Sequence, residues 1–291
     1  MTAGLEMPRN LVESLAGDRD DRRRDWAARL PERVAGIADR WALSIGAPFQ
    51  PGGMTAWVAP TRTADNHDVV LKVCFRHDES EHEVEGLQLW AGNGTVLVHR
   101  AEKDDDTAYL LLERAAEDRL LAGEPEPMQD EVIAGLLRRL WFVPRAGHPF
   151  RPLTQMCAEW ADQHDAYPHP AIDPGLERAG LELFRSLPAT ATDERLLLTD
   201  LHAENVLAAE REPWLVIDPK PYVGDPAYDP LQHMLNCPER LHADPDALIR
   251  RMADLCGVDR ERLRLWLFAR CVVESAWWPG ATVLAARLAP G

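Results

Sequence analysis

The sequence predicts an α+β protein of two lobes, a small and mainly antiparallel β lobe followed by a larger helical lobe. Two observations predict this class. Short apolar runs with strand-like alternation precede residue 113, whereas apolar residues three or four apart dominate after it. A chain of 291 residues with 46% hydrophobic content can also bury two sizeable cores. We therefore predict a first lobe at residues 1–113 and a second at residues 114–291.

The first lobe is expected to begin with helices and to continue with strands. Apolar residues at spacings of three to four predict amphipathic helices within residues 19–45. The turn-forming segment Pro51-Gly52-Gly53 precedes two apolar runs that predict antiparallel strands, Thr55–Ala59 and Asp68–Cys74. One helix and two further strands complete the lobe: Glu79–Trp90, Thr95–His99 and Tyr109–Glu113.

The second lobe is predicted to be mainly helical. Three segments show helical spacing: Glu131–Trp141, Leu153–His164 and Leu176–Leu187. The exception is a hairpin, because a polar turn separates the apolar runs Val206–Ala209 and Trp214–Ile217. Helices resume at Asp244, and Asp259 is expected to cap a helix through Trp277 that Pro279-Gly280 ends.

The charge balance narrows the classes of partner. There are 32 basic and 48 acidic residues, a formal net charge of -16, which repels nucleic acid and anionic lipid and suits a small cationic substrate. Acidity that serves only solubility is the alternative. The five cysteines form no C-x-x-C pair, and no apolar run is long enough to span a membrane. We expect a soluble cytoplasmic protein, bound to neither nucleic acid nor membrane and without an obligate protein partner.

The predicted hairpin carries a candidate metal site. Asn205 precedes its first strand and Asp218 follows its second, so antiparallel pairing places the two side chains nearly opposite each other. Hard oxygen ligands with room for water and phosphate suit Mg²⁺. Asp200 ends an apolar run five residues before Asn205, and a short loop can hold it beside the same metal. This D-x-x-x-x-N spacing is typical of phosphoryl transfer, although each residue alone also suits a turn.

A lysine inside an apolar strand adds a second part of the same chemistry. Lys72 lies within Val69–Val73, where an unpaired ammonium would be costly. Glu83 follows eleven residues later on the expected helix. A strand lysine held by a helix carboxylate and directed at nucleotide phosphates is the arrangement of kinases. A solvated edge lysine is the alternative.

Together these segments resemble the aminoglycoside phosphotransferases with the protein-kinase-like fold, in particular the streptomycin 6-kinase type that includes hydroxyurea and viomycin kinases. The resemblance covers most of the chain. It is strongest in three segments: Asp200-Leu201-His202-Ala203-Glu204-Asn205-Val206-Leu207, Trp214-Leu215-Val216-Ile217-Asp218-Pro219-Lys220 and Val223-Gly224-Asp225-Pro226-Ala227-Tyr228-Asp229. The helix Glu83–Trp90 and the segment Leu110–Arg114 look like the helix and the hinge of the family's first lobe.

The resemblance implies a role for each matching residue. Asp200 would be the catalytic base, and Asn205 and Asp218 the Mg²⁺ ligands. ATP would be held by a phosphate ligand with its partner and by three hinge residues whose backbone meets the adenine: Lys72, Glu83, Glu113, Arg114 and Ala115. Asp225 would brace the catalytic loop. The first lobe would thus bind nucleotide, and the second would carry the catalytic loop and the acceptor site.

Two departures from the family pattern concern loops. Leu198-Thr199 stands where members of the resembled family commonly carry His-Gly or His-Trp before the catalytic aspartate, so we expect this loop to be held differently. The loop that would cover the nucleotide has only Gly52-Gly53 in place of G-x-G-x-x-G.

The expected acceptor is a small cationic antibiotic, with the 6-hydroxyl of streptomycin as first choice and conferred resistance as the implied role. Viomycin, hydroxyurea or a metabolite are alternatives. Four acids downstream of the catalytic aspartate are candidate acceptor ligands: Glu204, Asp229, Glu239 and Glu274. Each also suits a solvated surface.

Two rival interpretations belong to other classes. A zinc site could use His233, Cys237 and His242, with or without His202, although a lone cysteine is more often a packed thiol. The other rival is a nucleotide-binding pseudokinase that acts as a scaffold. A scaffold would have no need to keep a base, a phosphate-binding lysine and two metal ligands.

Overall fold

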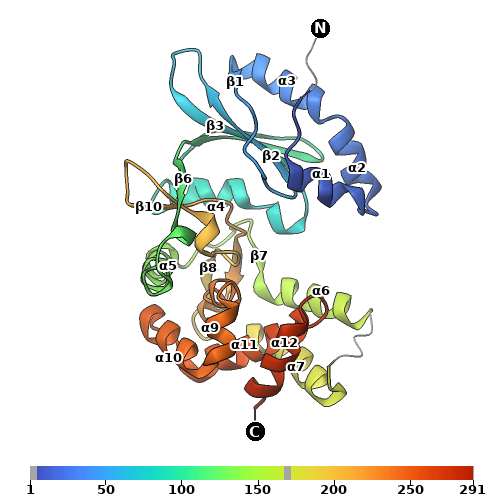
Figure 1. Cartoon of the computed structure of the whole chain (residues 1–291), viewed down its shortest axis with the longest axis vertical. Helices are drawn as coiled ribbons and strands as arrows, with labels where there is room; N and C mark the ends of the chain where they lie inside the picture. Colours follow the sequence, from blue (N-terminus) through green and yellow to red (C-terminus); the bar gives the residue numbers. More distant parts are fainter. Residues whose placement is uncertain (1–4, 167–171, 291) are drawn as a thin grey trace. The chain divides into compact units, whose positions relative to one another are not determined.

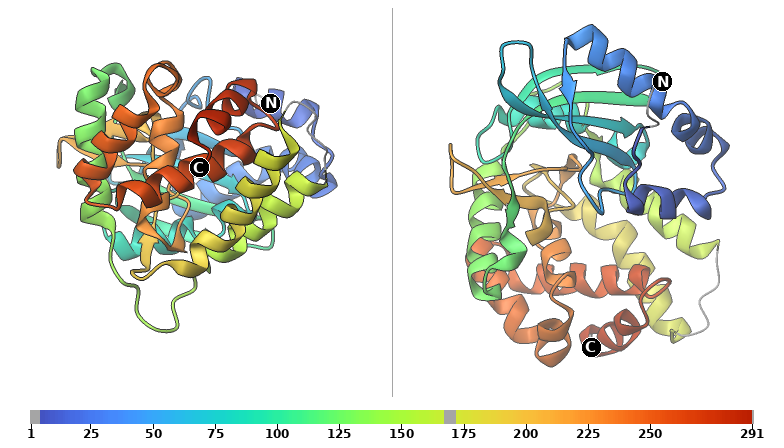
Figure 2. Two further views of the ribbon diagram at one scale, coloured as in Figure 1. Left: turned by 90° about the horizontal axis from the view of Figure 1, so that it is seen from below. Right: turned by 45° about the horizontal axis from the view of Figure 1, so that its top comes forward.

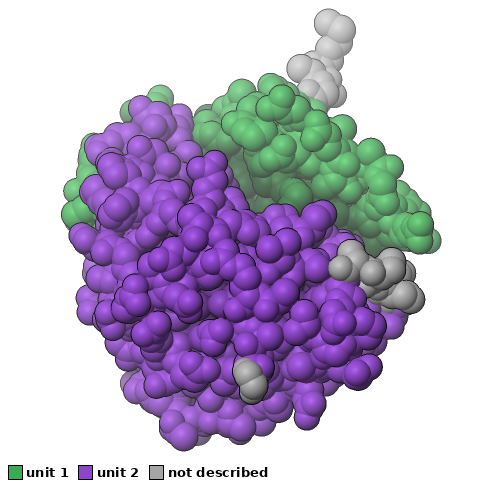
Figure 3. All heavy atoms as spheres, turned by 60° about the horizontal axis from the view of Figure 1, so that its bottom comes forward, with its two compact units in different colours: residues 1–116, 209–215 green, residues 117–208, 216–291 purple. Residues whose placement is uncertain are grey.

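The chain divides into two compact units in the computed structural model, which describes residues 5–166 and 172–290. Unit 1 comprises residues 1–116 and 209–215, and unit 2 comprises residues 117–208 and 216–291 (Figure 3). The chain therefore passes from one unit to the other near residues 116, 208 and 215. The sequence predicts a single division at residue 113 and gives no sign that segment 209–215 joins the first unit.

Unit 1 is built on a five-stranded sheet whose strand order is β1-β2-β3-β5-β4 (Figure 1). All four neighbouring pairs are antiparallel. The strands are β1 (Ser44–Ile45), β2 (Ala56–Arg62), β3 (Asp68–Phe75), β4 (Val98–Lys103) and β5 (Thr107–Glu113). Strand β4 overlaps the predicted strand Thr95–His99 but begins at Val98 and ends at Lys103. Just before it, the Leu97 N–H donates to the Glu113 carboxylate instead of a backbone carbonyl, so the regular ladder begins after Leu97.

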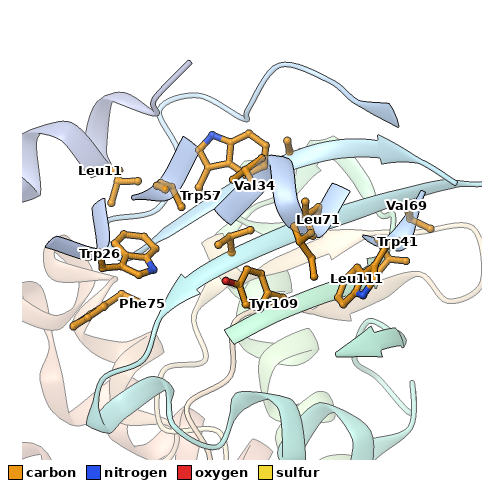
Figure 4. Packing of buried hydrophobic residues seen from close by; sticks show 14 residues of the cluster. Leu11, Trp26, Val34, Trp41, Trp57, Val69, Leu71, Phe75, Tyr109 and Leu111 are labelled. Carbon is orange, nitrogen blue, oxygen red and sulfur yellow. The ribbon is translucent and has the colours of Figure 1, made fainter. Parts of the chain in front are cut away.

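Three N-terminal helices cover one face of this sheet: α1 (Arg9–Ala16), α2 (Asp21–Ala28) and α3 (Leu30–Trp41). Figure 4 shows their apolar side chains packed against those of the strands. Trp26 of α2 lies 5.7 Å from Phe75, measured between ring centroids. Alternation along β3 directs Val69, Leu71 and Val73 into this core, so Lys72 projects from the opposite face of the sheet.

Helix α4 (Glu83–Trp90) supplies the partner of Lys72 from a point just after β3 in the sequence. Its end is sharp because two consecutive residues adopt left-handed backbone, Ala91 with φ 50° and Gly92 with φ 78°. At Gly92 a Cβ atom would also collide with the side chain of Leu97. Glycine is therefore required where the chain turns away from this helix.

Unit 2 contains the remaining helices (Figure 2). They are α5 (Glu126–Leu140), α6 (Leu153–Asp165), α7 (Pro174–Ser186), α8 (Leu231–Leu235), α9 (Pro238–Ala243), α10 (Pro245–Cys256), α11 (Arg260–Glu274) and α12 (Pro279–Leu288). Asp259 caps α11 as predicted, but the helix ends at Glu274, before Trp277. Pro279 begins α12, because proline suits the first position of a helix.

Short strands complete the fold in two three-stranded sheets. One has the order β10-β9-β6, from Trp214–Val216, Val206–Ala208 and Ala116–Leu120, and contains the predicted hairpin. The other has the order β7-β11-β8, from Arg151–Pro152, Tyr222–Gly224 and Arg195–Leu197. The predicted α+β class, with an antiparallel sheet followed by a mainly helical part, is confirmed. Within the described ranges, no helix has the length and apolarity needed to cross a membrane.

Candidate active site

Unit 1 contains a buried lysine–glutamate pair. Lys72 Nζ lies 2.7 Å from Glu83 Oε1 and 2.8 Å from Oε2. The two side chains are only 7% and 3% exposed. Two charges in an apolar interior are tolerated when they are paired and hydrogen-bonded, and this pair meets that condition. The structure thus brings together the two residues that the sequence predicts as phosphate ligand and partner.

The predicted hinge follows directly from β5. The Glu113 N–H donates to the carbonyl oxygen of Leu97 (2.8 Å), so this N–H is not available to a nucleotide base. The Glu113 carboxylate accepts from the Leu97 N–H (3.0 Å) and from Arg211. Arg114 is exposed and Ala115 is half-buried.

The loop between β1 and β2 is fastened to helix α1. Asn10 donates its side-chain amide to the carbonyl of Gly52 (2.9 Å) and its backbone N–H to the carbonyl of Pro51 (3.0 Å). Gly52 has φ 76°, and a Cβ atom there would overlap with Pro8. Glycine at this position is therefore explained by the packing of the loop on the N-terminal segment.

Unit 2 contains the predicted catalytic and metal-binding residues. The Ile217 N–H donates to the carbonyl of Asn205 (2.9 Å), which closes the foot of the hairpin and places Asp218 next in the chain. The Asn205 amide nitrogen donates to the carbonyl of Asp200 (3.0 Å), so its Oδ1 is the atom left for a cation. Asp218 is exposed and has φ 53°. One carboxylate and one amide oxygen at the foot of the hairpin fit a hard divalent cation.

The predicted catalytic loop is anchored by Asp229. This fully buried carboxylate accepts hydrogen bonds from the backbone N–H groups of Leu198 (3.0 Å) and Thr199 (2.6 Å) and from the indole of Trp141 (2.8 Å). Burial raises the pKa of Asp229 to about 6, although the three donors oppose that rise. Because Asp229 is enclosed and its oxygens are engaged, it does not fit the predicted role of acceptor ligand.

The loop is also held by Thr199 and Lys220. Thr199 has φ 48°, and its hydroxyl donates to the carbonyl of Lys220 (2.7 Å). The Lys220 N–H donates to the carbonyl of Leu198 (2.9 Å). The Lys220 ammonium lies 3.1 Å from Asp200 Oδ2, with both side chains partly exposed. Sequence analysis assigns no role to Lys220, although the residue lies in a segment that resembles the family. Its position two residues after Asp218 is the only feature of the sequence that places it near the predicted metal site.

Asp225 has a different structural role from the predicted one. Its carboxylate accepts hydrogen bonds from Arg262, from the indole of Trp266 and from the N–H of Ala227. Asp225 therefore joins the segment after β11 to helix α11, and the predicted catalytic loop is held instead by Asp229, four residues later.

The other candidate acceptor ligands lie on the surface or in ion pairs. Glu204 lies within the predicted catalytic loop, just before Asn205, and its side chain is 74% exposed. Glu239 is exposed on α9. Glu274 is one-quarter exposed and lies 2.7 Å from the guanidinium of Arg270. These contacts bring none of the three together with Asp200.

The zinc alternative has no support in the contacts of its residues. His233 is buried, and its Nε2 lies 2.9 Å from the carboxylate of Asp130, which also binds Arg240 and Arg251. Cys237 is buried, and burial raises the pKa of its thiol to about 11. Across residues 5–166 and 172–290, no three His, Cys, Asp or Glu side chains are grouped so that they could hold a metal ion.

Comparison with known proteins identifies the family. The family model for the aminoglycoside/hydroxyurea antibiotic resistance kinases matches residues 40–281. The chain belongs to this family. It is 35% identical to the streptomycin 6-kinase of Streptomyces griseus, across 94% of this chain and 91% of that protein. It is 36% identical to the hydroxyurea phosphotransferase of Kitasatospora aureofaciens, across 94% of this chain and 81% of that protein.

Solved structures agree on the fold of this family member. A choline kinase from Streptococcus pneumoniae superposes with a TM-score of 0.60 at 15% identity, covering 88% of this chain and 97% of that one. An aminoglycoside phosphotransferase from Streptomyces rimosus, solved with ADP and streptomycin, gives a TM-score of 0.52 at 15% identity, covering 86% and 99%. The predicted protein-kinase-like fold is confirmed.

Family membership also confirms that this antibiotic resistance kinase is a small-molecule phosphotransferase, and it implies the use of ATP. The named relatives are themselves kinases, which favours the enzyme over the scaffold interpretation. The roles of individual residues are not established by these comparisons and are proposed below.

Proposed function

We propose that this kinase transfers the γ-phosphoryl group of ATP to a hydroxyl of streptomycin, with the 6-hydroxyl as the first choice, and so confers resistance. The main observation in its support is the gathering of Asp200, Asn205 and the foot of the hairpin in a chain 35% identical to a streptomycin 6-kinase. A second relative named streptomycin 6-kinase is 33% identical.

Asp200 is the proposed catalytic base. Its side chain is one-fifth exposed, and one carboxylate oxygen faces the ammonium of Lys220. A carboxylate that stays partly open can accept a hydrogen bond from an incoming hydroxyl, orient it and take its proton as the new bond to phosphorus forms. Positioning of the acceptor carries most of the effect, because phosphoryl transfer requires little covalent participation by the protein.

Lys72 is the proposed ligand of the α- and β-phosphates. Glu83 holds the Lys72 ammonium through two short contacts, so the charge is in place before nucleotide binds. The adenine is assigned to the hinge, where the carbonyl of Glu113 and the backbone of Arg114 and Ala115 supply its hydrogen-bond partners.

Mg²⁺ is the proposed metal, held by Asn205 Oδ1 and the carboxylate of Asp218. A hard cation with two protein oxygens completes its coordination with water and phosphate oxygens. When bound, the metal neutralises charge on the transferring phosphate. The protein prepares this site by using the Asn205 amide nitrogen in a bond to Asp200, which orients the amide oxygen away from that carbonyl.

The acceptor is proposed to be cationic, because the chain carries a formal net charge of -16. Glu204, Glu239 and Glu274 remain candidate ligands for its cationic groups, whereas Asp229 is withdrawn because it is enclosed. Hydroxyurea is the second candidate acceptor, since the hydroxyurea phosphotransferase is as similar to this chain as the streptomycin 6-kinase. Location in the cytoplasm stays a prediction.

A coupled assay of ATP consumption tests the proposal. Purified enzyme with Mg²⁺ would be offered streptomycin, other aminoglycosides, viomycin and hydroxyurea, and the phosphorylated position would be read by ³¹P–¹H NMR. We expect the highest kcat/KM with streptomycin and a product phosphorylated at the 6-position. If the enzyme phosphorylates hydroxyurea but not streptomycin, hydroxyurea becomes the proposed acceptor in place of streptomycin.

A further inference from the structure

Arg211 makes an unusually large set of contacts for a residue in a hairpin turn. It lies between β9 and β10, in the segment 209–215 that belongs to unit 1. Its guanidinium donates to both carboxylate oxygens of Glu113, at 3.0 and 2.8 Å, and to the carbonyl oxygens of Gly92 (2.6 Å) and Thr95 (2.9 Å). A planar guanidinium fork fits a carboxylate with two parallel bonds, which fixes orientation as well as distance.

Apart from Glu212, its neighbour in the chain (3.0 Å), the residues that Arg211 contacts belong to the proposed hinge or to the segment after α4. Glu113 is the first residue of the hinge. Gly92 and Thr95 follow the C-terminus of α4, the helix whose first residue is Glu83. A cation beside the carbonyl groups at a helix C-terminus is also favourable for the helix dipole. One side chain therefore joins the hinge to the helix that holds the phosphate-binding lysine.

Glu113 is held on both sides by these contacts. Its carboxylate accepts from Arg211 and from the Leu97 N–H, and its own N–H donates to the Leu97 carbonyl. Burial disfavours the Glu113 carboxylate, but the hydrogen bonds from Arg211 and Leu97 outweigh burial, so the pKa of Glu113 is lowered. The glutamate is thus kept ionised for the ion pair, and its peptide unit has little freedom to rotate.

We propose that Arg211 is a positioning residue for adenine recognition: it fixes Glu113 and thereby orients the hinge backbone that meets the base. This inference rests on the proposed function, because it assumes that the nucleotide binds at the hinge. Arg211 touches neither the base nor the phosphates in this proposal. It acts through Glu113, so its loss should affect the base end of the nucleotide more than the phosphate end.

Binding of ADP and of inorganic tripolyphosphate to purified variants tests the proposal. We expect Arg211→Ala to weaken ADP binding about five- to tenfold, the worth of roughly one well-placed hydrogen bond, in isothermal calorimetry. Tripolyphosphate, which has no base, should bind within about twofold of wild type, a change below the worth of one hydrogen bond. In the full reaction, KM for ATP should rise by the same factor as the Kd of ADP while KM for the acceptor stays unchanged.

Arg211→Lys and Arg185→Ala are the matched comparisons. Lysine keeps the charge but not the two-pronged geometry, so it should restore part of the ADP affinity. Arg185 is 36% exposed, close to the 34% of Arg211, and is paired with two carboxylates, Asp162 and Asp165, in unit 2. Its truncation should leave ADP binding unchanged, which controls for the loss of a surface ion pair.

Two outcomes would overturn the proposal: unchanged ADP affinity in Arg211→Ala, or equal losses for ADP and tripolyphosphate. If Arg211→Ala does not fold, Glu113→Gln replaces it, because the amide keeps the shape and weakens the ion pair; wild-type ADP affinity in that variant would also overturn it. ADP binding requires no acceptor. A wild-type enzyme that binds ADP but phosphorylates no tested acceptor would therefore refute the acceptor, while the Arg211→Ala comparison still decides this inference.

Discussion

The two units each contain a lysine–carboxylate pair, and the pairs differ in burial. In unit 1, Lys72 and Glu83 are almost fully enclosed and make two contacts of 2.7 and 2.8 Å. In unit 2, Lys220 and Asp200 are 29% and 20% exposed and make one contact of 3.1 Å. The first pair is fixed by its surroundings, whereas the second is open to water and to an incoming molecule.

This difference in burial agrees with the different roles proposed for Lys72 and Asp200. A lysine that must hold phosphates gains from a position set in advance, and the cost of burying it is offset by the glutamate. A base must exchange its hydrogen-bond partner during the reaction, so a carboxylate with a weak, partly solvated ion pair is better suited. Variants of the two pairs should therefore separate loss of folding from loss of chemistry.

The largest effect is expected on activity from Asp200→Ala. Removing a general base costs about 10²- to 10⁴-fold in kcat. The carbonyl of residue 200, which accepts the bond from Asn205, is retained in the variant. ADP affinity and the thermal unfolding temperature should consequently stay close to wild type. Steady-state kinetics with calorimetry would measure both, and near-normal turnover would refute the assignment of the base.

Removing one member of the buried pair, Lys72 and Glu83, should instead lower the stability of the fold. Lys72→Ala leaves the Glu83 carboxylate enclosed without its lysine, and we expect a loss of about 3–5 kcal/mol in the free energy of unfolding, measured in urea. The double variant Lys72→Met with Glu83→Leu removes both charges and should regain most of that loss while remaining inactive. Equal stability of the single and double variants would show that the pair is not strongly coupled.

The contribution of Asp229 to the stability of the fold is expected to depend on pH. Its pKa of about 6 lies above the value of about 3.9 for an unfolded chain, so its contribution to stability is fully present below about pH 4 and is lost as pH rises through about 6. Asp229→Asn cannot titrate. The stability lost on this substitution should therefore be largest below about pH 4 and should shrink by about 2 kcal/mol between pH 4.5 and pH 7.5. Urea unfolding across this range would measure it, and a constant difference would contradict the raised pKa.

The difference between the two pairs also explains what the sequence could reveal. A lysine inside an apolar strand, with a glutamate eleven residues later on the next helix, is a local pattern, and the sequence predicts both the strand and the helix. The hairpin is equally local, because its two apolar runs and the turn between them are consecutive in the chain. The sequence alone therefore places Asn205 and Asp218 at its foot.

Long-range contacts account for what the sequence does not show. The sequence suggests Asp229 as an acceptor ligand or a surface acid, because its donor Trp141 lies 88 residues away and its other donors are backbone groups, which have no sequence signature. Arg211 lies 119 residues from Gly92, in a segment whose local pattern predicts only a polar turn. Such contacts depend on how the helices and strands pack, and a single sequence taken alone does not show them.

The smallest effect is expected from Lys220→Ala, which tests the open pair. A partly exposed ion pair contributes about 0–1 kcal/mol to stability, so unfolding in urea should scarcely change. The ammonium nevertheless holds one Asp200 oxygen, and releasing that oxygen should lower kcat by up to about fivefold, which corresponds to roughly 1 kcal/mol. Lys220→Arg keeps the charge and should recover part of the rate. A fall in stability as large as that of Lys72→Ala would mean that the partly exposed pair of Lys220 and Asp200 stabilises the fold as strongly as the buried pair does.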